Sequence, residues 1–246
     1  MRLLAIDIGN SNISAGVFWR RGLIKRYGIP TREKKYNNYF KKIFARNKID
    51  DTIVCSVVPK VCRVLAQDIM VLSGKKPHLI GRDIEVPIKN LYRDPKEVGF
   101  DRLVNAYAGT QLYGSPLIII DFGTAVTFDV ISKKREYLGG MILPGLGISL
   151  DALTEKTALL PRVKLEKPRS FIGRDTKSSI LSGVLFGFGA SINYFSERIK
   201  QEIGRNAKVI GTGGKIDFIK KFSDKFDKID KDLTLKGLYY IYQRKS

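Results

Sequence analysis

Three carboxylates in this 246-residue chain stand at positions where an acidic group can do chemistry. Asp7 and Asp121 each end an apolar run, and Asp101 begins a helical pattern with Arg102 beside it. A carboxylate at the end of a buried strand is unfavourable unless it has a partner. A bound cation or a transferable proton is a partner of this kind. These positions are therefore the starting points for a candidate site.

The residues after Asp7 form a turn that suits a phosphate group. Segment 3–18 predicts a buried strand, a polar turn and the strand's hairpin partner. Gly9 allows close approach to the backbone, and Asn10, Ser11 and Asn12 add polar side chains to the amide donors of the turn. Asp7 is suited to the metal ion that accompanies a phosphate. The alternative is a hairpin in which Asn and Ser only shape the turn.

The same pattern recurs more than a hundred residues later, which favours the phosphate interpretation. Segment 118–130 again has an apolar strand, an Asp, one apolar residue, a Gly, a hydroxyl-bearing turn at Thr124 and a second strand. The separation is too long for a solenoid repeat. It indicates two similar domains, 1–114 and 115–246, each with one phosphate loop facing a shared cleft. Paired Asp-x-Gly turns of this kind resemble the sugar-kinase and actin-like ATPase superfamily.

Composition limits the class of protein. An apolar content of 43% supports a real core, and no apolar run reaches the roughly 18 residues of a membrane span. We expect a cytoplasmic protein with no membrane partner. The net charge of +20 is spread along the chain, so it favours a solvated surface, a thermophile or an anionic substrate over a nucleic-acid partner.

The cysteines and the histidine favour structural roles. Cys55 lies in a strand-like run and Cys62 on the apolar face of the next helix, and their spacing matches no zinc pattern. We expect both to be buried and reduced. His78 is the only histidine, so Ser–His–Asp catalysis has little support and a structural role is favoured.

The remaining pattern predicts strands followed by alternating helices and strands in each half. In the first half, strands at 3–8, 13–18, 23–29, 52–58 and 77–80 alternate with helices after Pro30 and Pro59, and a loop precedes the helix that begins near Asp101. In the second half, strands over 118–130, 137–143 and 208–211 are joined by helices after Pro144 and Thr176, and a last helix contains Leu235 to Tyr242. The fold class is therefore α/β.

Two further features of the pattern leave a choice between a structural and a functional role. In the first turn of its helix, Asp101 either stabilises the helix start, with Arg102 exposed, or acts as a base beside a cation that orients an anionic substrate. In the long helix after Thr176, Gly183, Gly187 and Ala190 share one side. Helical glycines lower stability, so this side is expected to pack closely, and we predict a homodimer.

Taken together, these motifs resemble type III pantothenate kinases along nearly the whole chain. The resemblance rests on the order and spacing of six short motifs: Asp7-Ile8-Gly9-Asn10-Ser11-Asn12, Gly99-Phe100-Asp101-Arg102, Asp121-Phe122-Gly123-Thr124, Gly139-Gly140 with Pro144-Gly145, Gly173-Arg174-Asp175-Thr176 with Ser182-Gly183, and Thr212-Gly213-Gly214. Ser11 stands where the family usually has Thr, and Phe100 where it usually has a small residue. The resemblance implies two ribonuclease-H-like domains, each a mixed five-stranded sheet with flanking helices, and an ATP cleft between them.

The resemblance also implies an activity and a set of site residues. The activity is ATP-dependent phosphorylation of pantothenate to 4'-phosphopantothenate, the first step of coenzyme A biosynthesis. Asp101 would be the general base, and the cations would be Mg²⁺ or Mn²⁺ with ATP, at Asp7, and K⁺ or NH₄⁺ at Asp121. The ATP-binding residues would be Asp7, Ile8, Gly9, Asn10, Ser11, Asn12, Ile13, Ser14, Gly123 and Thr124. The pantothenate-binding residues would be Tyr92, Gly99, Phe100, Asp101, Arg102 and Thr176.

Three alternatives stay open at this stage. One is a kinase or phosphatase of the same superfamily that acts on another small molecule. The second is a non-catalytic transcriptional accessory factor of the same fold, which the charge of +20 keeps open although Asp7, Asp101, Arg102 and Asp121 are all present. The third is a polymerising ATPase like actin, for which the chain is short.

Overall fold

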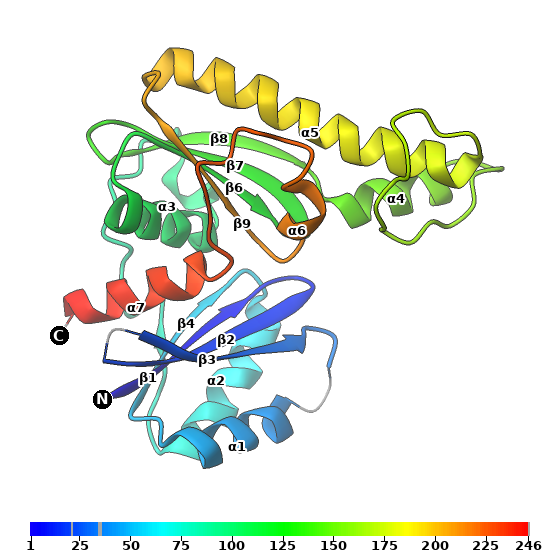
Figure 1. Ribbon diagram of the computed structural model, residues 1–246. Helices are drawn as coiled ribbons and strands as arrows, with labels where there is room; N and C mark the ends of the chain where they lie inside the picture. Colours follow the sequence, from blue (N-terminus) through cyan, green and yellow to red (C-terminus); the bar gives the residue numbers. More distant parts are fainter. Residues whose placement is uncertain (21, 34–35, 246) are drawn as a thin grey trace. The chain divides into compact units, whose positions relative to one another are not determined.

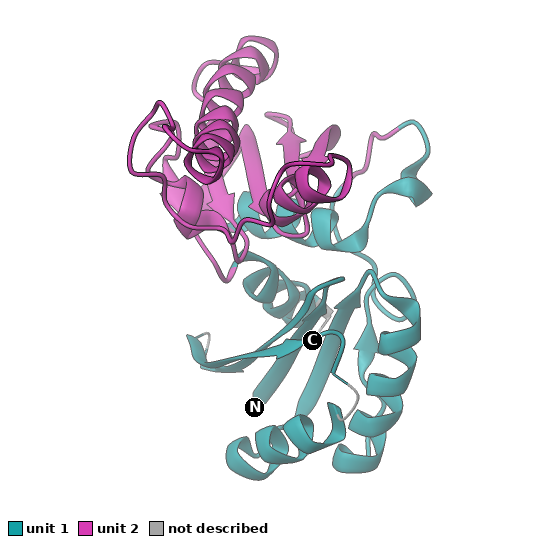
Figure 2. Cartoon of the chain, turned by 90° about the vertical axis from the view of Figure 1, so that its right-hand side faces the viewer, with its two compact units in different colours: residues 1–88, 93–111, 233–246 teal, residues 89–92, 112–232 magenta. Residues whose placement is uncertain are grey.

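The chain folds into two compact α/β units. The computed structural model describes residues 1–20, 22–33 and 36–245 (Figure 1). Of residue 245 it describes only the backbone. The first unit comprises Met1–Ile88, Arg93–Gln111 and Leu233–Ser246, and the second comprises Lys89–Tyr92 and Leu112–Asp232 (Figure 2). Each unit contains one five-stranded sheet.

The first unit is built on the sheet β3-β2-β1-β4-β5. Its strands are β1 (Arg2–Ile8), β2 (Asn12–Trp19), β3 (Gly22–Pro30), β4 (Asp51–Ser56) and β5 (His78–Leu79). Its helices are α1 (Tyr36–Asn47), α2 (Pro59–Ser73), the short 3₁₀ helix η1 (Pro95–Glu97), most of α3 (Phe100–Tyr113), and α7 (Leu233–Lys245). β1 pairs antiparallel with β2 and parallel with β4, so the sheet is mixed.

Alternate side chains of β1 enter two different cores, as the two-residue period of a strand requires. Leu3 and Ala5 pack with residues of α3 and α7, whereas Leu4 and Ile6 pack with residues of α1 and α2. Helices thus cover both faces of the first sheet (Figure 1). β1 is buried on both sides, which explains its nearly unbroken apolar sequence.

The second unit is built on the sheet β10-β9-β6-β7-β8. Its strands are β6 (Leu117–Phe122), β7 (Ala125–Ile131), β8 (Tyr137–Pro144), β9 (Lys208–Thr212) and β10 (Lys228–Ile229). Its helices are α4 (Leu146–Glu155), α5 (Thr176–Ile203) and α6 (Ile216–Ile219). Here β6 is the central strand, antiparallel to β7 and parallel to β9.

The 28-residue helix α5 lies along one face of this second sheet (Figure 1). By length and composition it could cross a membrane, with a mean hydropathy of 1.2 over its most apolar window. However, Leu185, Ile192 and Ile199 pack into the same core as β6 and β7. One face of α5 therefore belongs to the core of the second unit, and that packing accounts for the apolar residues on this face.

The two units confirm the predicted duplication of fold. In each, an antiparallel meander (β1–β2–β3 or β6–β7–β8) is extended by two parallel strands (β4 and β5, or β9 and β10) in the same spatial order. The compact units differ from the predicted division at residues 114 and 115 in three places, since residues 112–114 also belong to the second unit. Residues 89–92 belong to the second unit because Leu91 N–H donates to Tyr137 O at 2.9 Å beside β8, and α7 belongs to the first.

A polar contact holds α7 on the first sheet. Tyr242 Oη donates to Asp51 Oδ2 at 2.5 Å, and His78 Nε2 lies 3.2 Å from the same oxygen. Burial raises the pKa of Asp51, but the hydrogen bonds from Tyr242 and from Thr52 N–H and the nearby His78 outweigh it, so the pKa is lowered. The structure thus confirms a structural position for His78. Tyr242 also packs in the apolar core beside Leu238.

Candidate active site

The first predicted phosphate loop is the turn between β1 and β2. Gly9 N–H donates to Asn12 O at 3.1 Å, which closes the turn. Asn10, Ser11 and Asn12 are exposed, whereas Asp7 and Ser14 are half-buried. This arrangement leaves polar side chains and backbone open to a ligand. The side chains of Ile8 and Ile13 are part of the apolar core, so only their backbone is available to a ligand. The predicted ATP-binding residues of this turn therefore include some that offer a side chain and others that offer only their backbone.

Thr31 supports this loop and was missed in the sequence. Its Oγ1 donates to Gly9 O at 2.7 Å, and its N–H donates to Ser11 O at 3.1 Å. Thr31 is buried, which fits a positioning role. The signal was available, because β3 ends at Pro30, and Pro30 is the register partner of Asn12 in the antiparallel pair β2–β3. A polar residue at that point must lie beside the β1–β2 turn.

The second predicted phosphate loop is the turn between β6 and β7. Gly123 N–H donates to Ala125 O at 3.1 Å, and Gly123 and Thr124 are exposed. The start of α4 packs directly against this turn, since a Cβ added to Gly145 would lie 2.0 Å from Thr124 O. Only glycine fits there. The Pro144-Gly145 motif therefore serves the close approach of α4 to the second loop.

Asp121 lies at the base of that loop, against the turn that follows β9. Its register partners are Thr127 in β7 and Thr212 in β9. Gly213 has a φ of +92°, and a Cβ placed on it would lie 2.3 Å from Asp121 Oδ1 and 2.5 Å from Phe122 N. The carboxylate thus lies against backbone that only glycine permits at this distance. A carboxylate in this position is available as an oxygen ligand, the kind that hard cations prefer.

Asp7 and Asp101 both lie near the Cys55 thiol in the first unit. Asp7 is the register partner of Cys55 in the parallel pair β1–β4. Burial raises the pKa of Cys55 well above its ordinary value, and the negative charges of Asp7 and Asp101 raise it further. Cys55 is therefore a buried, protonated thiol, as predicted. Since both charges act on Cys55, the two predicted functional carboxylates of this unit lie near the same end of its sheet.

Asp101 is placed by the start of α3. Its Oδ1 accepts a hydrogen bond from Arg102 N–H at 2.9 Å, and a Cβ on Gly99 would lie 2.6 Å from the same oxygen. Gly99 therefore makes room for the carboxylate to fold back over the loop. Burial raises the pKa of Asp101, although the Arg102 N–H and the Arg102 charge oppose it. A raised pKa suits a carboxylate that must accept a proton.

Arg102 is buried, with 9% of its surface exposed. The structure thus corrects the simpler interpretation, in which Arg102 was an exposed residue of the first helical turn. That interpretation relied on amphipathic spacing, but nine consecutive residues of α3 are buried, so α3 has no solvated stripe at this point. A buried cation next to a half-buried carboxylate is unfavourable for folding alone, so the pair favours a functional role.

A further correction concerns Cys62. Its side chain is half-buried and free, where the sequence predicted a buried residue. The reason is that α2 buries only Leu65 and Ile69 fully. Burial raises the pKa of Cys62, so its thiol is not an activated nucleophile.

Tyr92 and Thr176, predicted to bind substrate, belong to the second unit. Tyr92 N–H donates to Asn90 Oδ1 at 3.0 Å, and its ring lies 3.3 Å from the position of a Cβ on Gly139, which has a φ of +122°. Gly139 therefore seats the Tyr92 ring. Thr176 is the exposed first residue of α5, after a capping box formed by Asp175 and Ser178. Phe100, in the first unit, is 39% exposed.

The structure thus gathers the predicted residues into two sets. The first unit brings together the β1–β2 turn, Asp7 and the Gly99–Arg102 loop, and the second brings together the β6–β7 turn, Asp121 and Gly213. Among the residues that the structure describes, no group of three or more His, Cys, Asp or Glu side chains could hold a metal ion. A divalent cation here would have to take ligands from its substrate as well, as Mg²⁺ commonly does with phosphates.

Comparison with known families gives the site its context. Residues 3–198 match the type III pantothenate kinase family. The chain belongs to this family. The match covers both phosphate loops, the Asp101 loop and the start of α5. It therefore supports a kinase and confirms the family resemblance; five of the six motifs lie within the match, and Thr212-Gly213-Gly214 lies beyond it.

Solved structures confirm the fold. A protein described as a Baf family transcriptional activator from Campylobacter jejuni has a TM-score of 0.62 and 21% identity, and the similarity covers 98% of both chains. The activator of the 2-hydroxyisocaproyl-CoA dehydratase from Clostridium difficile has a TM-score of 0.58 and 12% identity over 100% of this chain and 96% of the other. Component A of the (R)-2-hydroxyglutaryl-CoA dehydratase from Acidaminococcus fermentans has a TM-score of 0.56 and 10% identity over the whole of both chains. At these identities the similarity shows the α/β fold alone.

Proposed function

We propose that this protein transfers the γ-phosphoryl group of ATP to the primary hydroxyl of pantothenate, the first step of coenzyme A biosynthesis. The observation that carries the proposal is the family match over residues 3–198. Its residue-level support is the raised pKa of Asp101 beside the buried Arg102. Family membership alone suggests the reaction, and this pair supplies a base and a cation for it.

In this mechanism Asp101 accepts the proton of the attacking hydroxyl. The hydroxyl oxygen forms its bond to the γ-phosphorus as the bond to the β-phosphate oxygen breaks and ADP leaves. The proton passes to the Asp101 carboxylate, whose raised pKa brings it closer to that of an effective base at neutral pH. Phosphoryl transfer depends mainly on positioning and charge stabilisation, so a modest base suffices.

Arg102 would hold the pantothenate carboxylate, because a guanidinium offers two parallel donors to a carboxylate. Its low exposure strengthens such a contact, since a buried charge pair is little screened by salt. The backbone of Gly99 and Phe100, together with Tyr92 and Thr176, would complete the pantothenate site. The Tyr92 ring is a preorganised surface for this purpose because Gly139 fixes it.

The two hairpin turns would bind the ATP phosphates. Both expose backbone and polar side chains, namely Asn10, Ser11 and Asn12 in the first and Thr124 in the second. Thr31 fixes the first turn, which reduces the reorganisation needed on binding. The C. difficile neighbour was solved with ADPNP bound, and ATP use in this fold supports the same role here.

Two cations complete the proposal. Asp121 would hold K⁺ or NH₄⁺ together with backbone oxygens, and Asp7 would contact the Mg²⁺ or Mn²⁺ that arrives with ATP. When bound, these ions neutralise charge that develops on the phosphates. The close approach of Gly213 to Asp121 supports the first assignment, because it leaves the carboxylate beside main-chain groups.

We also propose that the protein is a cytoplasmic homodimer formed through α5. Gly183 and Gly187 are exposed and have nothing within 4 Å of an added Cβ, and Ala190 is exposed one turn further on. A partner helix could approach this face closely.

The decisive experiment measures ADP release with pantothenate, ATP and Mg²⁺, with and without K⁺ or NH₄⁺. Turnover that requires the monovalent cation supports the reaction and the role of Asp121. Turnover without the monovalent cation would still support the kinase reaction but would refute the assignment of that cation to Asp121. A folded protein that binds ATP but phosphorylates no pantothenate would contradict the proposal and favour another acceptor or a non-catalytic role.

A further inference from the structure

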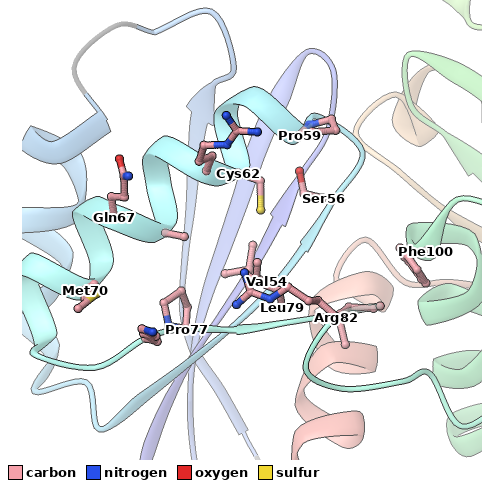
Figure 3. A pocket seen from close by; sticks show the side chains of 15 residues that line it. Val54, Ser56, Pro59, Cys62, Gln67, Met70, Pro77, Leu79, Arg82 and Phe100 are labelled. Atoms are coloured by element: carbon pink, nitrogen blue, oxygen red, sulfur yellow. The ribbon is translucent and has the colours of Figure 1, made fainter.

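A cavity of about 540 Å³ opens in the first unit, and no residue of either predicted phosphate loop lines it (Figure 3). It lies between α2, the end of β4, the segment that follows α2, and Phe100 at the start of α3. Its volume is within the range of small-molecule sites, roughly 300–1,000 Å³. The kinase mechanism uses none of these residues except Phe100.

The cavity exists because α2 is longer than the strand beside it. The 15 residues of α2 span about 22 Å, whereas the two residues of β5 span about 7 Å. Leu65 and Ile69 pack into the core, but the adjacent stripe of Cys62, Ala66 and Met70 faces the cavity instead. Met70 is 47% exposed. The helix therefore carries an apolar stripe that the strands beneath it do not fully cover.

The interior of the cavity is apolar. Val54 and Leu79 form the floor, Pro77 lies on one side, and the Phe100 ring closes one end (Figure 3). That ring lies over Gly81, where a Cβ would come within 2.0 Å of it, so glycine there lets the ring form the wall. The raised pKa of Cys62 keeps its thiol protonated, and it acts as one more weakly polar wall residue. An apolar ligand body fits such a lining.

The charged residues of the cavity all have the same sign. Arg63, Lys76 and Arg82 line it, and no Asp or Glu does so within the described part of the chain. Arg82 is held by Asp83 at 2.9 Å. By contrast, no described carboxylate lies in ion-pair range of Arg63 or Lys76, and both are exposed. Two available cations beside an apolar interior are complementary to a ligand with an apolar body and one anionic group.

We propose that this cavity is a binding site for a small amphipathic anion, with its apolar body over Val54 and Leu79 and its acidic group at Arg63 and Lys76. This site does not depend on the proposed kinase activity, and its binding test requires no turnover. The apolar lining and the two cations together favour an acid with an aliphatic or aromatic body over a neutral apolar molecule.

The test compares decanoate with decanol by titration calorimetry on the full chain. We expect decanoate to saturate a single site and to bind more tightly than decanol. The double variant Arg63→Gln/Lys76→Gln should weaken decanoate about tenfold, the loss expected for a charge-assisted contact, and leave decanol unchanged. The matched control Lys41→Gln/Lys42→Gln removes the same charge from the exposed face of α1 and should change neither. Equal binding of acid and alcohol, or an equal loss in the control, overturns the proposal.

Two further measurements locate the ligand. Ala66→Trp should fill the cavity and abolish binding of both probes, with an unchanged circular dichroism spectrum as the test of folding. Decanoate should also slow alkylation of Cys62 by iodoacetamide, read by mass spectrometry in the wild-type protein. Unchanged alkylation at saturating decanoate would place the probe elsewhere and refute the site. This second measurement needs no variant, so a folding defect in Ala66→Trp does not decide the outcome.

The position of Phe100 gives the site a consequence that rests on the proposed function. Phe100 forms the wall, and the next residue is Asp101. We expect saturating decanoate to change the KM for pantothenate in the wild type and not in Ala66→Trp. A KM and kcat that do not respond in the wild type would refute this coupling, whereas the calorimetric result still decides the binding site.

Discussion

The substitution Asp101→Asn should have opposite effects on activity and stability. Asn keeps the size of the side chain, and its Oδ1 can still accept the Arg102 N–H at 2.9 Å. The loss is the negative charge and the ability to accept a proton. Removing a general base lowers turnover by about 10²–10⁴-fold, equivalent to roughly 3–5 kcal/mol of activation free energy. We therefore expect a folded enzyme with this loss in kcat and an almost unchanged affinity for ATP.

Stability should change in the other direction. Burial raises the pKa of Asp101 in the folded protein above its unfolded value, so the charged form is disfavoured by folding. In the wild type this costs nothing below the unfolded pKa; the cost grows as pH rises from there and is complete above the folded pKa. Asp101→Asn should therefore be more stable than the wild type at pH 7, and the difference should disappear as pH falls below the usual range of an aspartate.

The assays are ADP release for turnover and urea unfolding at neutral and acidic pH. Asp94→Asn is the matched control, because Asp94 is an exposed carboxylate of the same loop that accepts only a local hydrogen bond from Lys96 N–H. It should keep full turnover. Wild-type turnover in Asp101→Asn would remove the residue from the base role. A variant that loses activity and stability together would point to a structural role instead.

Three other perturbations test separate parts of the structure. Tyr242→Phe should destabilise the protein by roughly 1.5–3 kcal/mol in urea unfolding, because it removes a hydrogen bond to a charged group; the control Tyr240→Phe should not. That difference should shrink as pH falls through the lowered pKa of Asp51, and a difference that grew at acidic pH would contradict the assignment. Gly213→Ala should cost roughly 1–3 kcal/mol and abolish cation-dependent turnover, because it forces a Cβ against Asp121 at a φ of +92°, while Gly214→Ala, with nothing within 4 Å, should be tolerated. Light scattering should give the mass of a dimer for the wild type and for the control Ala45→Glu, and of a monomer for Ala190→Glu; a monomeric wild type at micromolar concentration would remove the dimer.

The duplicated fold could be predicted because its signal is local. The hairpins at 3–18 and 118–130 each carry their apolar runs, their Asp and their glycine turn within one short segment, and strand periodicity needs no knowledge of distant contacts. The positions of Asp7 and Asp121 at the ends of central strands followed from the same pattern and are confirmed by the pairing registers. The apolar residues of these strands are thus sufficient to predict that the strands are buried.

What could not be predicted depends on partners far away in the chain. Spacing showed that α7 needs an apolar surface, but not which sheet supplies it, and Tyr242 contacts Asp51 across 191 positions. The burial of Arg102 was missed because α3 is covered on all sides there, which no periodicity reveals. The cavity beside α2 was missed because it depends on the short length of β5. These three features depend on tertiary contacts, which the local sequence pattern does not reveal.

The place of α7 in the first unit affects how the protein is made. A ribosome produces the N-terminal segments first, yet one face of the first sheet can be covered only in part, by α3, until Leu235, Leu238 and Ile241 have been synthesised. All of the second unit is translated before these residues. The second unit can therefore complete its core while Leu3 and Phe18 of the first unit are still partly exposed to solvent. Exposed apolar residues of this kind make nascent chains prone to aggregate or to recruit chaperones. The unit that is begun first is the one finished last.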